Sequence, residues 1–411
     1  MKYKLTYLVA FALSLVAAFA FKDQESVVQF FTVVSKPLIQ TGIALSAVFA
    51  LFTISGSVAA LRRTSSFAST LGKTLLWGLC SMIFSLIIAF IAGNFLLPAF
   101  GFSISAVSSE SINEGLQTAA NMFSGSPFLQ GGAGGNFASV YLLMLCIIIV
   151  SYIIGYFMKP DIEVVRPAYV LFNSITEVGF RYGNFLTKLY NVIIFFSGTH
   201  YIQMLLKSGV ATDAGYLLLT IAIVAAVLLL IVYPLMHLIA IKFYRKNPTV
   251  TMLSSFTLGL SAMLSGSSLF TLPIFEVIAR KENDIPKKHV SSASPLFITF
   301  IRVGVAVVSY ILVLAILSVS SVDVTLWKLI ALPFIIMLLS IPSGYMAGFE
   351  IAFVASIALR FLGISVESNF YLLMAFVPVF GALAAFIDTV SSFYGVSSLA
   401  LQEKELIGVV K

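Results

Sequence analysis

The stretch LSGSSLFTLPIF (264–275) interrupts an apolar part of the chain with four hydroxyl side chains, a glycine and a proline. Ser267, Ser268 and Pro273 mark a point where the hydrogen bonding of a helix is broken. Inside a membrane, such backbone is tolerated only where it is buried in protein or lines a cavity. The stretch therefore predicts the tip of a re-entrant hairpin, although a spanning helix kinked by serine and proline would give the same local pattern.

The composition places this stretch in a membrane. Hydrophobic residues make up 60% of the 411 residues and charged residues only 10%, with a mean hydropathy of +1.05, whereas soluble domains carry about 25% charged residues. Four runs are long enough to cross a hydrocarbon core of about 30 Å, namely 76–99, 137–158, 215–241 and 368–387. Because backbone polar groups must be paired in lipid, the chain is predicted to be an all-α polytopic membrane protein.

The charged residues and cysteines exclude several other classes of protein. The formal net charge of +7 comes from basic residues scattered between apolar runs, which is typical of topology signals and not of a nucleic-acid-binding patch. The two cysteines lack metal-ligand spacing, and the histidines lie in segments without nucleophile-elbow spacing. We therefore expect no metal, no cofactor and no enzyme activity.

The apolar runs also predict the order of the elements along the chain. Lys2 and Lys4 place the N-terminus in the cytoplasm, whether residues 1–20 form a first helix or a signal peptide. The Ser- and Gly-rich residues 101–136 predict an extracellular loop. Helices are expected near 5–21, 36–60, 69–99, 137–158, 170–206, 215–245, 291–320 and 369–400.

Two further segments, 249–279 and 325–361, do not fit single spans. Basic clusters flank the first on both sides, so a single crossing would put one cluster outside, and a hairpin opening to the cytoplasm avoids this. The second has a weakly acidic surround and suits an outside-opening hairpin, with SIPSGYMAG (340–348) at its tip. Each is followed by an apolar helix with one charged residue, Arg302 or Asp388. This arrangement is typical of inverted repeats, with a substrate site where the broken tips meet.

At these residues the sequence resembles the dicarboxylate/amino acid:cation symporter family. The similarity rests on KFYRKNP (242–248), SGSSLFTLP (265–273), IPSG (341–344) and FIDTVSSFYGVSS (386–398), together with the spacing from TLP to HVSSASPL (289–296). The resemblance implies a homotrimer with eight transmembrane helices and two re-entrant hairpins per chain, an uncleaved first helix, and an elevator-type transport mechanism. The second tip would contribute Pro342, Ser343 and Gly344 to the substrate site.

The resemblance also implies a division of the chain into a scaffold and a moving transport domain. Scaffold helices 1 and 2 would occupy residues 1–68, and scaffold helices 4 and 5 residues 137–210. The transport domain would combine helix 3 (69–100) with residues 211–411, which hold helices 6 to 8 and both hairpins. Residues 101–136 would be the extracellular loop.

The sequence departs from the family at the ion sites. Gapless alignment from Pro295 puts residues 301–305 on the family's sodium-binding Asn-Met-Asp-Gly-Thr segment, of which Gly304 alone is retained. Leu399 replaces a sodium-binding aspartate, whereas Thr299 matches a residue of a third ion site. Two sodium sites are therefore predicted to be lost, with Thr299 and Gly304 as remnants.

The departures extend to the predicted substrate site in the last helix. Asp388 matches the aspartate that binds a substrate amino group. Ser391 stands in place of the arginine that grips a side-chain carboxylate, Ser392 replaces a threonine, and Gly395 replaces an asparagine that contacts substrate and ion. An acidic amino acid in the family's usual pose is therefore not expected.

Arg302 is the strongest candidate for a functional charge, because placing a charged side chain within a membrane span costs several kcal/mol of free energy. It could supply a permanent positive charge near Asp388 in place of a lost cation, or it could form a structural salt bridge with Asp388, Glu276 or Glu350. Asp388 itself could bind an amine, carry a proton or only neutralise Arg302. The hydroxyls of Ser267, Ser268, Ser391 and Ser392 could bind substrate, or bond backbone and permit close packing.

The sequence thus predicts a secondary transporter of a small polar organic solute, an amino acid or a carboxylate, in a cell membrane. A bacterial inner membrane is expected, with both termini in the cytoplasm and the lipid bilayer, the solute and two further copies of the chain as partners. A sodium-independent carrier is favoured by Arg302, Val303 and Leu399. A residual sodium symporter using Thr299 and carbonyl ligands, and a channel-like or sensory protein without saturable exchange, stay open.

Overall fold

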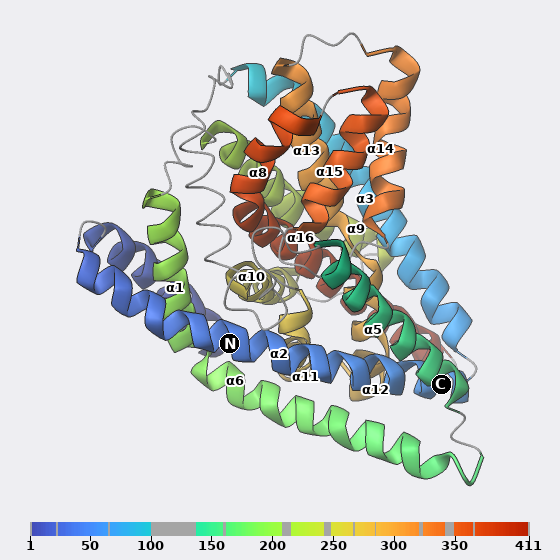
Figure 1. Cartoon of the computed structure of the whole chain (residues 1–411). Helices are drawn as coiled ribbons and strands as arrows, with labels where there is room; N and C mark the ends of the chain where they lie inside the picture. The colour runs from blue at the N-terminus through green and yellow to red at the C-terminus, as the bar shows by residue number, and fades with distance from the viewer. Residues whose placement is uncertain are drawn as a thin grey trace.

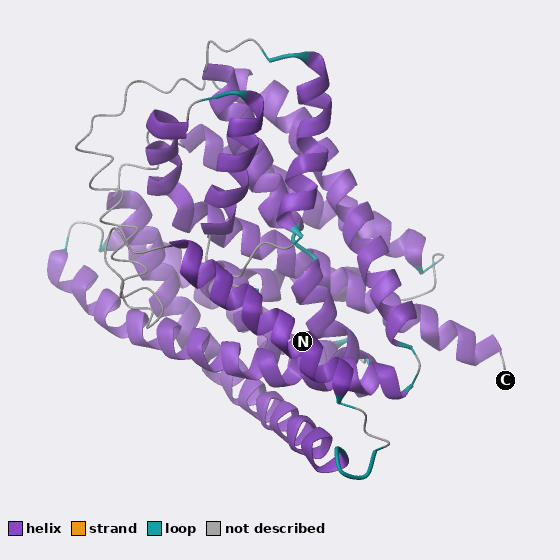
Figure 2. Ribbon diagram, turned by 45° about the vertical axis from the view of Figure 1, so that its right-hand side comes forward, coloured by secondary structure: helices purple, strands orange, loops and turns teal. Residues whose placement is uncertain are grey.

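A computed structural model describes residues 2–21, 24–64, 66–99, 137–158, 162–207, 215–241, 248–265, 268–283, 285–319, 324–341, 349–364 and 366–409. Within these ranges the chain is helical and contains no strand (Figures 1 and 2). The N-terminal half contains α1 (Lys2–Ala20), α2 (Glu25–Arg63), α3 (Phe67–Ala99), α5 (Phe137–Phe157), α6 (Arg166–Lys207), α8 (Gly215–Val227), η1 (Leu228–Val232) and α9 (Tyr233–Ala240). The C-terminal half contains α10 (Pro248–Ser265), η2 (Leu269–Thr271), α11 (Leu272–Glu282), α12 (Lys287–Phe300), α13 (Val303–Val319), α14 (Leu326–Ser340), α15 (Phe349–Leu362) and α16 (Val366–Val409).

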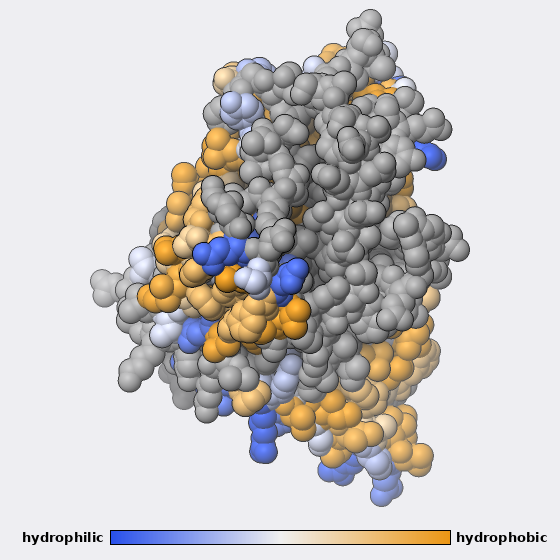
Figure 3. All heavy atoms as spheres, turned by 60° about the vertical axis from the view of Figure 1, so that its left-hand side comes forward, coloured by the Kyte–Doolittle hydropathy of each residue, from blue (hydrophilic) through white to orange (hydrophobic). Residues whose placement is uncertain are grey.

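The described part of the chain has helices long and apolar enough to cross a membrane. Four segments meet this condition, Phe67–Ala99, Gly215–Ala240, His289–Ser318 and Val379–Ala400. The first two leave most of their residues at the surface, whereas the last two are almost entirely buried. Apolar side chains cover much of the described surface in Figure 3, and α3 exposes Ile83, Phe84, Ile87, Phe90 and Ile91. Such a surface suits lipid, and these features confirm a helical membrane protein.

The helices pack in two groups. In the first group, α2 packs against α5 and α6, and α1 packs against α6; α2 and α6 run side by side along the lower edge of Figure 1. In the second group, α3 and the helices from α8 to α16 pack around α13 and α16. The groups touch where α11 packs on α6 and where α12 packs on α2.

The segment expected as one helix over 215–245 contains a local change of winding. A π-helical turn, η1, occupies Leu228–Val232, and the amide of Tyr233 donates to the carbonyl of Leu228 five residues earlier. Pro234 follows directly and has no amide hydrogen to donate to the carbonyl of Leu230. In a regular α-helix its ring would also clash with the carbonyl of Leu230. The wider turn accommodates the proline at membrane depth.

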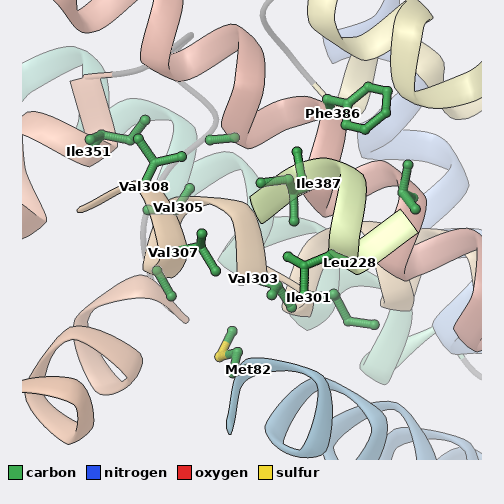
Figure 4. Packing of buried hydrophobic residues seen from close by; sticks show 14 of the residues in the cluster. Met82, Leu228, Ile301, Val303, Val305, Val307, Val308, Ile351, Phe386 and Ile387 are labelled. Carbon is green, nitrogen blue, oxygen red and sulfur yellow. The ribbon is translucent and has the colours of Figure 1, made fainter. Parts of the chain in front are cut away.

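The membrane span expected over 291–320 is present as His289–Ser318, and its helix is broken near the middle. α12 ends at Phe300, Ile301 is extended (φ −91°, ψ 100°), and α13 begins at Val303. α13 is apolar on all sides and lies at the centre of the core, where Figure 4 shows Val305 and Val308 near Ile351, and Val303 near Ile301. A helix that is hydrophobic all round is expected to be buried in this way.

Candidate functional site

The candidate site forms where the three interrupted segments come together. α10 ends at Ser265 and η2 begins at Leu269, within the predicted first tip; α12 ends at Phe300 and α13 begins at Val303; and α15 begins at Phe349, just after the predicted second tip. Ser267, Pro342, Ser343 and Gly344 lie outside the described residues, so their predicted roles stay predictions. The flanking residues Ser268 and Glu350 are described, and both lie beside Arg302.

Arg302 is the largest side chain that is fully buried in the described part of the chain, with 2% of its surface exposed. Its Nη1 atom lies 3.3 Å from Oδ2 of Asp388 and 3.4 Å from Oγ of Ser268. Its Nη2 atom lies 3.4 Å from Oε1 of Glu350. One guanidinium therefore connects Ser268 just before η2, the start of α15 and the middle of α16.

These contacts identify two of the three predicted partners of Arg302. Asp388 and Glu350 are both ion-paired with it and are both buried. Glu276, the third candidate, is buried in α11, and its predicted pairing with Arg302 stays a prediction. The distances of 3.3 and 3.4 Å exceed those of tight charge-assisted hydrogen bonds, about 2.7–2.9 Å. The geometry is that of a loose cluster.

Asp388 also binds the first turn of α13. Its Oδ1 atom accepts a hydrogen bond of 2.6 Å from the amide of Gly304, and the amide of Val305 contributes to the same carboxylate. The first amides of a helix lack partners within the helix and carry partial positive charge. Asp388 therefore acts as a cap supplied by another helix, in addition to pairing with Arg302.

Gly304 has a clear packing role, independent of the predicted ion-site role. A Cβ atom at this position would lie 2.0 Å from the carbonyl oxygen of Ala384 and 2.8 Å from its Cα. These are backbone atoms of α16, so α13 and α16 could not stay this close with any larger residue. Close approach of the two helices is what brings the Gly304 amide to Asp388.

The predicted residues further along α16 contact α3 and α12. Ser392 donates from its hydroxyl to the carbonyl of Phe297 at 3.3 Å, and the carbonyl of Ser391 accepts from Nε1 of Trp77 at 3.1 Å. A Cβ on Gly395 would lie 2.2 Å from the Phe297 ring and 2.8 Å from Trp77. Ser392 and Gly395 thus have packing roles, and Trp77 is a contact that sequence reasoning missed.

The Ser391 hydroxyl differs from its neighbours. Ser391 is fully buried, and its hydroxyl has no hydrogen-bond partner of normal geometry among the described residues, although it lies near Tyr233. It stands one turn beyond Asp388 on the same face of α16. A buried hydroxyl without a partner is uncommon and points to a water, an ion or a ligand group that completes it.

Thr299, the other predicted ion-site remnant, bonds within its own helix. Its hydroxyl donates to the carbonyl of Pro295 at 2.6 Å, and the side chain is buried. Pro295 lies inside α12, and the break that follows leaves carbonyl groups at the end of this helix without regular helical partners. In the described part of the chain, no group of three or more His, Cys, Asp or Glu side chains is placed to hold a metal ion.

His237 occupies a structural position away from the cluster. Its Nδ1 atom lies 2.8 Å from the hydroxyl of Ser398, which itself donates to the carbonyl of Tyr394. Because that hydroxyl has one hydrogen, Nδ1 of His237 must be the donor. The histidine therefore ties α9 to α16 through a fixed tautomer.

The comparison with known families agrees with this architecture. The model of the sodium:dicarboxylate symporter family matches residues 5–398, which is nearly the whole chain. No curated protein sequence matches the chain. The match confirms the resemblance seen at the hairpin tips and in the last helix, and it identifies the protein as a membrane transporter of the symporter type. The chain belongs to the sodium:dicarboxylate symporter family.

Proposed function

We propose that this protein is a secondary transporter that moves a small polar organic solute, an amino acid or a carboxylate, with Arg302 taking the place of a coupling cation. The observation that carries this proposal is the buried guanidinium of Arg302, which contacts the first hairpin tip, the start of α15 and Asp388. Broken backbone at membrane depth marks solute sites in transporters built from inverted repeats. The substrate site would include Ser268, Arg302, Asp388 and Ser391.

The proposal includes an elevator mechanism in a homotrimer. The packing of α1, α2, α5 and α6 as one group supports a scaffold of residues 1–68 and 137–210. The packing of α3 with the helices from α8 to α16 supports a transport domain of residues 69–100 and 211–411. The trimer, the bacterial inner membrane and the cytoplasmic termini rest on the family resemblance and on the basic residues of the sequence.

The charge of Arg302 supports sodium-independent transport. Arginine keeps its proton under all ordinary conditions, so its charge is permanent. It lies 3.3 Å from Asp388, at the break where the family's ion-binding segment would be. Leu399, in place of a sodium-binding aspartate, is buried and apolar. We therefore expect saturable uptake without sodium.

The test combines ligand screening with uptake. Purified protein is first melted with amino acids, dicarboxylates and other small metabolites, with and without sodium, since a ligand of the folded state raises its apparent stability. The best ligand is then followed into proteoliposomes containing wild type, Arg302→Met or the matched control Arg280→Met. Arg280 stacks on the ring of Phe180, away from the cluster. Only Arg302→Met should lose uptake, and wild-type uptake in that variant would overturn the role given to Arg302.

A second candidate function is a residual sodium-coupled symporter of neutral amino acids or dicarboxylates. The retained break after α12 favours it, because carbonyl groups there, with Thr299 nearby, could still coordinate a cation. Uptake that requires sodium would establish this alternative. A protein that binds ligand but shows no saturable exchange would instead be the channel-like or sensory homologue.

A further inference from the structure

Three helix ends form a corner of the first helix group, away from the candidate solute site. α2 ends at Arg63, α5 ends at Phe157, and α6 begins at Arg166. These ends lie together at the lower right of Figure 1. Arg62 joins two of them, because its Nη1 atom donates to the carbonyl of Tyr156 at the end of α5.

The packing of α2 on α6 brings the basic ends of both helices to the same level. Ring pairs along this contact are Phe31–Phe195 and Phe52–Phe172, with centroids 5.8 and 4.9 Å apart. Residue numbers thus rise along α2 as they fall along α6, so the two helices are antiparallel. Because both helices rise by the same distance per residue, continuing this register places Arg62 and Arg63 level with the residues directly before Arg166.

The corner carries a net positive charge. Over 60–66 and 156–167 the basic residues are Arg62, Arg63, Lys159 and Arg166, and the acidic residues are Asp161 and Glu163. Four positive charges against two negative charges leave a formal net charge of +2. Arg63 and Arg166 are exposed. Basic residues at the ends of membrane helices favour the cytoplasmic side, so we expect this corner beside the headgroups of the inner leaflet.

Arg62 is held in a fixed orientation at this corner. Its Cζ atom lies 3.9 Å from the centroid of the Tyr156 ring, and its Nη1 atom donates to the carbonyl of the same residue. A guanidinium has five N–H donors, and its plane can bind two phosphate oxygens at once. Within the described residues no carboxylate pairs with Arg62, so donors remain for a phosphate group.

Exposed apolar side chains lie next to these basic residues. Phe157, the last residue of α5, is 70% exposed. Val164, in the connection to α6, is 88% exposed, and Ile162 is 46% exposed. A free phosphate would contact the arginines alone and leave this apolar area in water. A phospholipid would also cover the area with its acyl chains, which favours an amphiphile over a free anion.

We propose that this corner binds an anionic phospholipid of the inner leaflet, with its headgroup on Arg62, Arg63 and Arg166 and its acyl chains on Phe157 and Val164. A zwitterionic phospholipid carries a positive charge of its own and is repelled by the same arginines, so it binds more weakly. Because the three helix ends share one headgroup, the bound lipid also stabilises the first helix group. The inference is independent of the solute and of the proposed transport function.

The experiment titrates lipids into purified protein in a neutral detergent at low salt. The readout is the melting temperature, because a ligand of the folded state raises its apparent stability. The probes are phosphatidylglycerol, phosphatidylcholine, and glycerol 3-phosphate, which is a headgroup without acyl chains. Phosphatidylglycerol should act at a concentration at least tenfold lower than phosphatidylcholine, and glycerol 3-phosphate should have no effect. Equal responses to the two lipids, or a response to glycerol 3-phosphate that matches phosphatidylglycerol, would overturn the proposal.

Variants test whether these arginines are the cause. R63Q/R166Q leaves Arg62 on Tyr156 and should weaken the response to phosphatidylglycerol at least tenfold, with the response to phosphatidylcholine unchanged. Arg181→Gln is the matched control, because Arg181 is also exposed on α6 and lies roughly 22 Å along the helix from Arg166.

Two results with these variants would contradict the proposal. One is a wild-type response in R63Q/R166Q, and the other is an equal loss in Arg181→Gln, which would show that any exposed arginine is sufficient. If the double variant does not fold, native mass spectrometry of the wild type decides. At least one phosphatidylglycerol retained per chain is expected, and retention of none would refute the site.

Discussion

The substitution Gly304→Ala tests whether the contact between α13 and α16 holds the site together. The added Cβ would lie 2.0 Å from the Ala384 carbonyl oxygen and 2.7 Å from its carbon. An ordinary contact between a carbon and a carbonyl oxygen is about 3.3 Å or more, so the two backbones must separate by about 1.3 Å. Both partners are helices packed in the core, and neither offers a flexible side chain that could move aside.

The cost of this separation follows from two contributions. Overpacking a close-packed core costs typically about 1–3 kcal/mol. The shift also weakens the 2.6 Å bond from the Gly304 amide to Asp388, and bonds to charged groups contribute about 1.5–3 kcal/mol. We expect a loss of about 2.5–6 kcal/mol in the free energy of unfolding, with solute binding reduced because Asp388 and Arg302 move apart.

The assay is thermal melting of detergent-purified protein, with Gly78→Ala as the matched control. Gly78 is also a buried helical glycine, and a Cβ there would meet Ile301 at 3.6 Å, which is an ordinary contact. The control should keep the wild-type melting temperature or exceed it slightly, since alanine favours helix over glycine. If Gly304→Ala melts together with the control, the packing argument is refuted.

Two further predictions use the same melting assay. Gly395→Ala should lower the free energy of unfolding by about 1–3 kcal/mol, less than Gly304→Ala. The added Cβ would meet the Phe297 side chain, which can rotate. A loss as large as that of Gly304→Ala would contradict this ranking. His237→Phe should lower the free energy of unfolding by about 1 kcal/mol, because the hydrogen bond to Ser398 is lost. His237→Asn can place a donor near the same point and should recover part of this stability. Equal melting temperatures of the two variants would show that the hydrogen bond contributes nothing.

The sequence was sufficient for the helical class and for the first helix interruption because both depend on local signals. Apolar runs have a length set by the bilayer, and Pro273, which lacks an amide hydrogen, favours the first turn of a new helix, where it lies in α11. The first interruption lies where the stretch 264–275 predicted it, between α10 and α11. The family match over residues 5–398 agrees with the motifs around it.

The contact partners of the site residues could not be predicted from local sequence signals. Three acids were equally open as partners of Arg302, and only the fold places Asp388 and Glu350 within 3.4 Å of it. Gly395 was expected to act at the substrate, yet it also makes room for Phe297. A glycine gives no sequence signal for what approaches it, because close approach depends on another helix.

The break at Ile301 shows most clearly how tertiary contacts override local sequence. Residues 296–308 form an apolar run with Arg302 as its sole charge, and Ile301 and Val303 would both fit a continuous buried helix. Interrupting a helix inside a membrane leaves backbone groups that must be bonded elsewhere. Asp388 bonds the start of α13 from another helix, and Arg302 contacts Ser268 and Glu350 from its position in the break. The carboxylate of α16 and the guanidinium that pairs with it therefore supply, from side chains, the bonding that holds the broken helix in place.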